Sequence, residues 1–186
     1  MRPSVRFAVN HLRRNPHIRA VEIGVNYGLH ALEMIEAFGD DLQTLHLIDP
    51  YLGEDSLGFD YDRARMQEME VNIGGHPKTC FLRRTSVEAA CILKYNLFDF
   101  VYLDGDHSFV DVIQDCFLWW PLVANGGILA GHDYKLLPEV EKGVMAFARL
   151  TSTPDEAMMI NYQVDGDDWW IINQPCHKII PERKAG

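Results

Sequence analysis

Five short apolar runs, each followed by a segment of helical spacing, constrain the fold of this chain more than any other feature. The runs are residues 18–24, 44–50, 78–83, 98–105 and 126–134. Each is short and continuous, which is typical of a strand buried on both faces of a sheet. The segments that follow them predict helices at residues 28–38, 60–73, 86–94, 108–122 and 138–150. This alternation indicates a doubly wound α/β fold with a parallel sheet.

The end of the chain follows a different pattern. Residues 157–163 and 168–172 are strand-like, and Asp165-Gly166-Asp167 lies between them. A Gly and two Asp residues between two such runs are typical of a hairpin. We therefore expect a doubly wound, mostly parallel seven-stranded sheet that ends in an antiparallel C-terminal hairpin. Sheets of this kind bind ligands at the carboxyl ends of their strands.

The predicted helix over residues 108–122 has the clearest helical periodicity. Its apolar stripe consists of Phe109, Ile113, Cys116, Phe117 and Trp120. Asp111, Gln114 and Asp115 fall on the opposite face. Ser108 is suited to cap the start of this helix.

Length and charge limit the partners of the protein. A chain of 186 residues is expected to form one domain, residues 1–186, with an N-terminal helix in 1–17, a core in 18–172 and a tail in 173–186. Its formal net charge of −10 argues against nucleic acid and against an anionic membrane surface. The sequence has no apolar run long enough to span a bilayer and no leader-like start, so we expect a cytoplasmic protein.

A glycine turn follows the first predicted strand. It reads Glu22-Ile23-Gly24-Val25-Asn26-Tyr27-Gly28, and glycine at these spacings lets a ligand approach the backbone. The Asn at position 26 distinguishes it from the G-x-G-x-x-G turn of dinucleotide sites. Asp49 ends the second strand, where such sheets hold a ribose by its hydroxyls. Alternatively, the glycines form a plain turn and Asp49 caps the chain before Pro50.

Polar residues also follow the third, fourth and fifth strands. Thr85 and Ser86 could contact an adenine edge, or Ser86 could simply cap a helix that carries Glu88 in its first turn. Strands four and five end in Asp104-Gly105-Asp106-His107 and in Gly131-His132-Asp133. If these strands are neighbours, Asp104, His132 and Asp133 can bind a divalent ion. Alternatively, Asp104 faces a cofactor while His132 and Asp133 form caps and hydrogen bonds.

Together these motifs carry a resemblance to a known family. The order E-I-G-x-x-x-G, an acid ending strand two, FDFVYLDGDHSF, W-W-P-L and GGILAGHDY resembles the class I S-adenosylmethionine-dependent methyltransferases. It is most similar to the small branch that includes macrocin-type and catechol-type O-methyltransferases. The resemblance covers residues 18–172 and implies a seven-stranded sheet with an antiparallel last strand.

The resemblance also implies roles for individual residues. Cofactor binding is implied for Glu22, Gly24, Asn26, Gly28, Asp49, Thr85, Ser86, Asp104 and Gly105. Within this set, Glu22, Gly24 and Gly28 would hold the methionine portion, Asp49 the ribose, and Thr85 and Ser86 would lie near the adenine. Metal binding is implied for Asp104, His132 and Asp133, and the catalytic residues would be His107, as the base, and Asp104. His132 departs from the usual acid or amide, which leaves manganese or iron open beside magnesium.

The sequence therefore predicts transfer of a methyl group from S-adenosylmethionine to a hydroxyl of a small-molecule acceptor, with assistance by Mg²⁺ or Mn²⁺ left open. Two other functions remain: a module that binds S-adenosylmethionine or a nucleotide without turnover, and a metal-dependent hydrolase or hydroxylase on the same sheet. A homo-oligomer is also left open.

Overall fold

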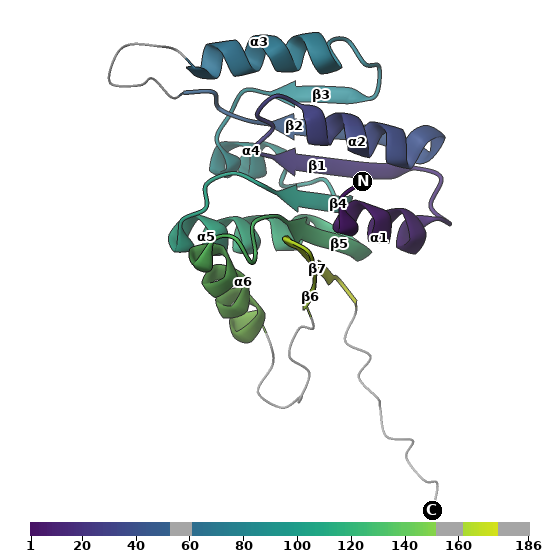
Figure 1. Cartoon of the computed structure of the whole chain (residues 1–186). Helices are drawn as coiled ribbons and strands as arrows, with labels where there is room; N and C mark the ends of the chain where they lie inside the picture. Colours follow the sequence, from purple (N-terminus) through teal and green to yellow (C-terminus); the bar gives the residue numbers. More distant parts are fainter. Residues whose placement is uncertain (53–60, 152–161, 175–186) are drawn as a thin grey trace, which may run out of the picture.

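The computed structural model describes residues 1–52, 61–151 and 162–174, and it contains one seven-stranded sheet (Figure 1). The strands are β1 (Ile18–Ile23), β2 (Leu42–Ile48), β3 (Thr79–Leu82), β4 (Phe98–Leu103), β5 (Val123–Gly131), β6 (Tyr162–Asp165) and β7 (Asp168–Ile172). Their order across the sheet is β3-β2-β1-β4-β5-β7-β6. The first five are parallel, whereas β7 is antiparallel to both β5 and β6. The predicted doubly wound sheet with its C-terminal hairpin is confirmed.

Helices cover both faces of the sheet. They are α1 (Pro3–Leu12), α2 (Leu29–Phe38), α3 (Tyr61–Ile73), α4 (Ser86–Leu93), α5 (Phe109–Trp119) and α6 (Pro138–Thr151). Buried side chains of α1, α2 and α3 form one core with the sheet, and those of α4, α5 and α6 form a second core on its other face. This two-sided cover explains why the central strands are almost continuously apolar.

The strand register brings the ends of the central strands to one level. Ile23 is paired with Ile48 of β2 and with Leu103 of β4, and Leu103 is paired in turn with Gly131 of β5. The residues that follow these four therefore emerge side by side at the carboxyl edge of the sheet. Every polar motif singled out in the sequence lies at this edge.

The apolar face predicted for α5 is confirmed at Cys116 but wrong at Phe117 and Asp115. The helix buries Val112, Asp115, Cys116 and Trp119, whereas Phe117, which belonged to the predicted stripe, is 44% exposed. The ring of Phe117 packs edge-on against Phe147 of α6. Because α5 packs against both the sheet and α6, its apolar residues lie on two sides of the helix. The buried side also contains an acid, Asp115.

Some predictions fall outside the described residues. Residues 157–161 of the first tail strand and residues 175–186 of the tail belong to these parts of the chain, and β6 begins at Tyr162. None of the helices in the described ranges has the length and apolar character that crossing a membrane requires.

Candidate active site

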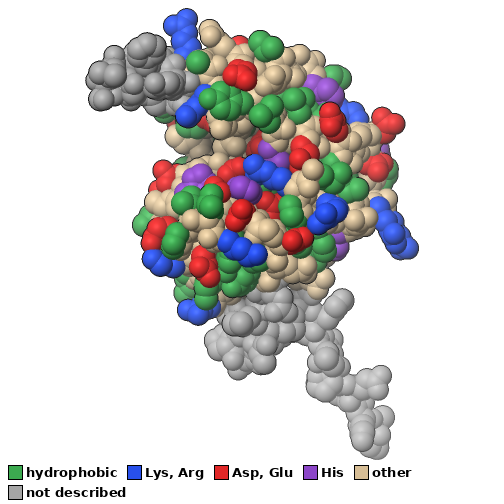
Figure 2. Space-filling model, viewed as in Figure 1, with side chains coloured by type: hydrophobic (Ala, Val, Ile, Leu, Met, Phe, Trp, Pro, Cys, Tyr) green, Lys and Arg blue, Asp and Glu red, His purple; other side chains and the backbone are tan. Residues whose placement is uncertain are grey.

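A cavity of about 770 Å³ opens at the carboxyl edge of the sheet. This volume lies within the range of small-molecule sites. Of the predicted cofactor residues, it is lined by Gly24, Asn26, Asp49, Thr85, Ser86, Asp104 and Gly105. Asp106, His107, Asp111 and Asp115 also line it. On the face shown in Figure 2, acidic, basic and histidine side chains gather where β1 and β4 end in the same view of Figure 1.

The glycine turn forms one end of this cavity. Gly24 has a φ of +83°, and a Cβ atom there would lie 2.0 Å from the backbone oxygen of Asp104. Only glycine fits a left-handed conformation at such a close approach. The turn therefore places the backbone of β1 directly against the end of β4.

Asp49 holds the glycine turn in place. Its Oδ2 accepts hydrogen bonds from the amides of Val25 (2.9 Å) and Asn26 (3.1 Å), and its Oδ1 accepts one from the amide of Tyr51 (3.0 Å). A carboxylate has about four acceptor positions. Three are used by the protein, so about one remains for a ribose hydroxyl. The structure thus shows the capping role that the sequence left open and keeps room for the cofactor role.

Glu22 and Gly28 lie behind the wall of the cavity rather than on it. Glu22 is 1% exposed, and its Oε1 lies 2.9 Å from Nδ1 of His30. Burial raises the pKa of Glu22, although His30 opposes this shift. Gly28 has a φ of +77° at the start of α2. The two residues therefore lie at the two ends of the glycine turn, outside the lining of the cavity.

The opposite end of the cavity lies at the start of α4. Thr85, not Ser86, caps this helix: its Oγ1 accepts from the amide of Glu88 (3.3 Å), and Glu88 accepts in return from the amide of Thr85 (3.0 Å). The hydroxyl of Ser86 instead donates to Oδ1 of Asp115 and accepts from Nε1 of Trp119 (2.9 Å). Burial raises the pKa of Asp115 to about 6, against a smaller opposing effect of Ser86.

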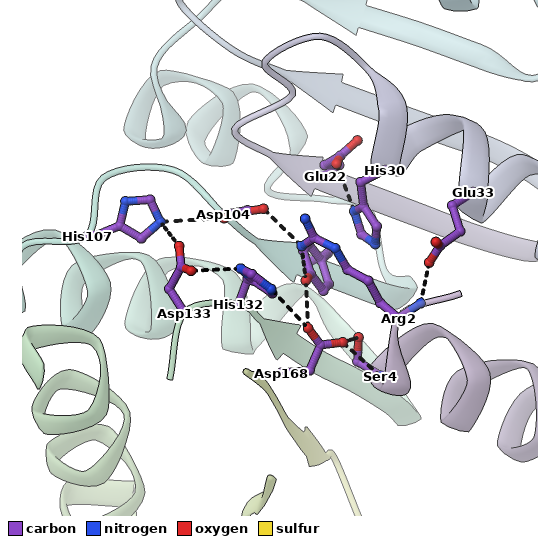
Figure 3. A network of polar contacts seen from close by, with 11 residues as sticks. Arg2, Ser4, Glu22, His30, Glu33, Asp104, His107, His132, Asp133 and Asp168 are labelled. Atoms are coloured by element: carbon purple, nitrogen blue, oxygen red, sulfur yellow. Dashed lines mark hydrogen bonds and ion pairs between the residues drawn. The ribbon is translucent and has the colours of Figure 1, made fainter. Parts of the chain in front are cut away.

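His107 lies between two carboxylates at the ends of β4 and β5 (Figure 3). Its Nε2 is 2.9 Å from Oδ2 of Asp133 and 3.5 Å from Oδ1 of Asp104. The interaction with Asp104 raises the pKa of His107, and the charge of Asp133 adds to this effect. An imidazole whose protonated form is stabilised in this way, and which faces a cavity, is suited to accept a proton.

His132 contacts the other carboxylate oxygen of Asp133, away from His107. Its Nδ1 lies 2.9 Å from Oδ1 of Asp133, and its Nε2 lies 3.8 Å from Oδ1 of Asp168. Among the described residues, the group whose ligand-type atoms all lie within 4.8 Å of one another consists of Asp104, His107 and Asp133. The structure thus brings together two members of the predicted metal site, Asp104 and Asp133, and adds His107 to them in place of His132.

This group fits a divalent ion in spacing. Nε2 of His107 is buried and has no partner in hydrogen-bonding geometry among the described residues, although two carboxylate oxygens lie near it. Converging atoms of this kind, one imidazole nitrogen and two carboxylate oxygens, suit manganese or iron better than magnesium. The guanidinium of Arg2 opposes a cation here, because its Nη1 lies 3.0 Å from Oδ2 of Asp104.

The sequence prediction missed Asp111 and Asp115 on the cavity wall, and it missed three residues of the polar network beside it: Arg2, Tyr102 and Asp168. Arg2 donates a hydrogen bond to the hydroxyl of Tyr102, which donates in turn to Oδ1 of Asp168 (3.3 Å). Burial would raise the pKa of Asp104, but His107 and Arg2 outweigh it and hold that pKa below its usual value. No local motif marks Arg2, which lies 102 positions before Asp104 in the sequence. Asp168 had a signal, since it is an acid at the first position of an apolar strand.

Comparison with known proteins shows what this architecture shares with others. A family described as a methyltransferase domain matches residues 21–134. An uncharacterized protein of Sinorhizobium fredii, y4gI, is 26% identical over 117 residues, which are 62% of this chain. The same region is only 13% of the length of that protein.

Solved structures share the fold. A Staphylococcus aureus protein assigned as a caffeoyl-CoA O-methyltransferase superposes with a TM-score of 0.63 at 14% identity, over 94% of this chain and 84% of that one. An O-methyltransferase from Bacillus cereus, solved with SAH, superposes with a TM-score of 0.59 at 14% identity, over 92% and 80% of the two chains. The family match spans more than half of the residues, and the sheet has the seven strands and the antiparallel last strand that the resemblance implied. The chain therefore belongs to the methyltransferase-domain family, within the class I S-adenosylmethionine-dependent methyltransferases.

Proposed function

We propose that this protein transfers the methyl group of S-adenosylmethionine to a hydroxyl of a small-molecule acceptor, with His107 as the general base. The observation that carries the proposal is the position of His107, which lines the cavity at the end of β4 and is flanked by Asp104 and Asp133. The O-methyltransferase names of two structural neighbours support the choice of a hydroxyl acceptor.

The cofactor would lie along the cavity between its two ends. The glycine turn and Asn26 would face the methionine portion, and Asp49 would accept a hydrogen bond from the ribose. Thr85 and Ser86, at the start of α4, would lie beside the adenine. The carboxylate of Asp104 and the backbone of Gly105 form the floor between these ends. An acidic floor suits the positive charge of a sulfonium group.

The reaction is a displacement at the methyl carbon. The acceptor oxygen attacks this carbon, the bond between carbon and sulfur breaks, and its electron pair leaves with the sulfur as S-adenosylhomocysteine. The acceptor proton passes to the neutral imidazole of His107. Asp104 and Asp133 stabilise the imidazolium that forms, and they also orient the ring. General-base catalysis of this kind typically contributes about 10²–10⁴-fold to the rate.

A divalent ion is a second candidate for the same place, favoured by the close group of Asp104, His107 and Asp133. Those three residues would hold it, and the ion would supply a lowered pKa for the acceptor hydroxyl. His107 would then be a ligand, and its role as a base would end. His132, the ligand expected from the sequence, would support Asp133 from behind.

One set of assays separates these functions. Purified protein would be incubated with S-adenosylmethionine and a panel of phenols, sugars and amines, and the formation of S-adenosylhomocysteine would be measured with and without EDTA. We expect turnover with hydroxyl acceptors that survives EDTA. Binding without turnover would instead indicate a module that only holds the cofactor, and turnover of amines alone would overturn the acceptor assignment.

The variant His107→Ala tests the base directly. We expect kcat to fall by about 10²–10⁴-fold while the affinity for S-adenosylhomocysteine is nearly unchanged. The acid limb of the pH–rate profile should disappear, since it reports protonation of this imidazole. If EDTA abolishes the wild-type activity and Mn²⁺ restores it, the metal-site reading replaces the base.

A further inference from the structure

Asp115 is a buried carboxylate for which the proposed reaction has no use. It is 6% exposed, yet it lines the cavity from the middle of α5, at the end where the adenine would lie. A carboxylate is costly to bury unless its oxygens meet donors. Its surroundings therefore indicate what it is placed to bind.

One oxygen of this carboxylate is fully engaged. Oδ1 accepts a hydrogen bond from Oγ of Ser86 at 2.5 Å, and that hydroxyl accepts from Nε1 of Trp119 at 2.9 Å. Because Trp119 supplies its own hydrogen, the hydroxyl hydrogen of Ser86 has to point to Asp115. Ser86 therefore has no hydrogen left to donate to a ligand, and it serves instead to fix the orientation of the carboxylate.

The second oxygen is open. No hydrogen bond from the described residues reaches Oδ2 of Asp115. This atom lies beside Gly105, where a Cβ atom would come within 3.9 Å of it. Since Gly105 has no side chain and itself lines the cavity, nothing at that position comes between Oδ2 and the ligand space.

Backbone hydrogen-bond donors line the same end of the cavity as this acceptor, at the start of α4. The capping box at Thr85 satisfies the amide of Glu88 and leaves the amides of Ser86 and Val87 without partners in the part of the chain that the structure describes. Both residues line the cavity. An ionised carboxylate that can only accept and an amide that can only donate form the complement of the edge of adenine, which presents an amine donor beside the N1 acceptor.

We propose that Asp115 determines the specificity of the site for adenine, by accepting a hydrogen bond from the exocyclic amine of the base at Oδ2. The proposal rests on the proposed cofactor site. A base with a carbonyl in place of the amine would set two acceptors against each other, and the buried carboxylate would remain unsatisfied. Sites built on a buried hydrogen-bonding group discriminate strongly for this reason.

The test compares S-adenosylhomocysteine with S-inosylhomocysteine, in which a carbonyl replaces the amine, by calorimetry. The wild-type protein should bind the adenine compound at least about 100-fold more tightly. In Asp115→Asn the amide oxygen can keep the bond from Ser86, which turns the NH₂ group toward the ligand. This variant should lose the preference or reverse it. Asp111→Asn, which removes a carboxylate from the same wall one turn earlier, is the matched control and should keep the preference.

The outcomes distinguish a wrong cofactor site from a wrong role of Asp115. If the wild-type protein binds neither compound, the cofactor site itself is wrong. If it binds the adenine compound but Asp115→Asn keeps the same ratio of affinities, the role of Asp115 is overturned while the cofactor site stands. An equal loss of preference in Asp111→Asn would assign the effect to the general negative charge of the wall, and would also overturn the proposal.

Discussion

At the scale of single residues, the acids of this site differ in what they hold. Asp49 binds three backbone amides, Asp104 binds a guanidinium and lies near an imidazole, and Asp115 binds one hydroxyl. The environments push their pKa values apart: that of Asp104 is lowered, whereas that of Asp115 is raised to about 6. Carboxylates of one cavity with opposite shifts are typical of sites where each acid has its own task.

Asp49→Ala should weaken both the fold and the binding of the cofactor. The change removes the acceptor for three amides and the proposed acceptor for a ribose hydroxyl. Hydrogen bonds to charged groups contribute about 1.5–3 kcal/mol, so the affinity for S-adenosylhomocysteine, measured by calorimetry, should fall by about 10- to 150-fold. Tyr51→Phe, which removes the hydroxyl that bonds to the carbonyl of Asn26, is the control for a loosened turn. An unchanged affinity in folded Asp49→Ala would assign this acid to the turn alone.

Asp115 makes the stability of the protein depend on pH. The pKa of this carboxyl rises on folding from 3.8 to about 6, chiefly because of burial. The folded state therefore keeps its proton where the unfolded chain has lost it, and the free energy of unfolding falls as the pH rises from about 4 to about 6. Above this range the cost is about 3 kcal/mol.

Asp115→Asn removes this titration. Relative to wild type, the variant should gain stability between pH 4 and pH 7, by up to about 3 kcal/mol, in urea unfolding at a series of pH values. Asp111→Asn should keep most of the pH dependence, because burial is the main cause of the raised pKa of Asp115 and the charge of Asp111 is a minor one. The same slope in wild type and Asp115→Asn would show that Asp115 does not carry the effect.

At the scale of elements, the ends of strands and the caps of helices position the site. Gly24 lets β1 turn against β4, and Thr85 fixes the first turn of α4 through its capping box with Glu88. Ser108 accepts a hydrogen bond from the amide of Asp111 and so caps α5 just after His107. The chemistry-bearing residues thus lie within a few positions of an element boundary.

Gly24→Ala should disrupt the fold at this boundary. The added Cβ would meet the backbone oxygen of Asp104 at 2.0 Å, and the φ of +83° is itself unfavourable for alanine. We expect the free energy of unfolding to fall by more than about 3 kcal/mol, beyond the range of backbone strain alone. Gly126→Ala is the matched control, because it combines a φ of +79° with open space. It should cost only about 1–2 kcal/mol, the range of the left-handed conformation. Equal losses in the two variants would contradict the close approach.

The sequence was sufficient for most of the elements because their signals are local. The apolar runs, the Asp-Gly-Asp turn at residues 165–167 and the cap at Ser108 each lie within a few residues. The buried face of α5 was not predictable in this way. Phe117 and Trp120 look like core residues on a helical wheel, but their partner is Phe147 of α6, which only the packed structure reveals.

The candidate site was predictable where it follows strands and hidden where it depends on contacts across the fold. Asp104, His107 and Asp133 follow strands β4 and β5, so the register brings them together. Arg2 reaches Asp104 across 102 positions of sequence. The side on which His132 lies depends on Asp168, which comes from the hairpin. No spacing within the sequence encodes either relation.

At the scale of the whole molecule, the two ends of the described chain meet beside the active site. The backbone amide of Ser4 in α1 donates to Oδ2 of Asp168 at 2.9 Å, and its hydroxyl donates to the same oxygen (Figure 3). Asp168 is 1% exposed at the start of β7, and its other oxygen accepts from Tyr102 of β4. A buried carboxylate with three donors thus joins α1, β4 and β7.

Four statements about the whole protein stay predictions. They are the cytoplasmic location, the lack of a nucleic-acid or membrane partner, the possibility of a homo-oligomer, and the single domain over residues 1–186.

Ser4→Ala should weaken this junction. The variant removes one donor from a buried carboxylate, so the free energy of unfolding in urea should fall by about 1.5–3 kcal/mol. Arg6→Ala is the control, because Arg6 also links α1 to the hairpin, through an ion pair with Asp165 whose side chains are both exposed. Such a pair contributes about 0–1 kcal/mol. If the two variants lose equal stability, the buried contact of Ser4 with Asp168 contributes no more to the free energy of unfolding than the exposed ion pair does.

The hydrogen bond between Ser4 and Asp168, which are 164 positions apart, can form only late in the synthesis of this domain. The ribosome synthesises α1 before β7, so Ser4 is made 164 positions and Tyr102 66 positions before the carboxylate to which both donate. Contacts between such distant positions are also the slow ones in folding. The nascent chain can thus shape its glycine turn, which needs only β1, β2 and β4, while the polar network beside His132 is still missing. A nascent polypeptide that has not yet exposed residue 168 therefore has no completed site.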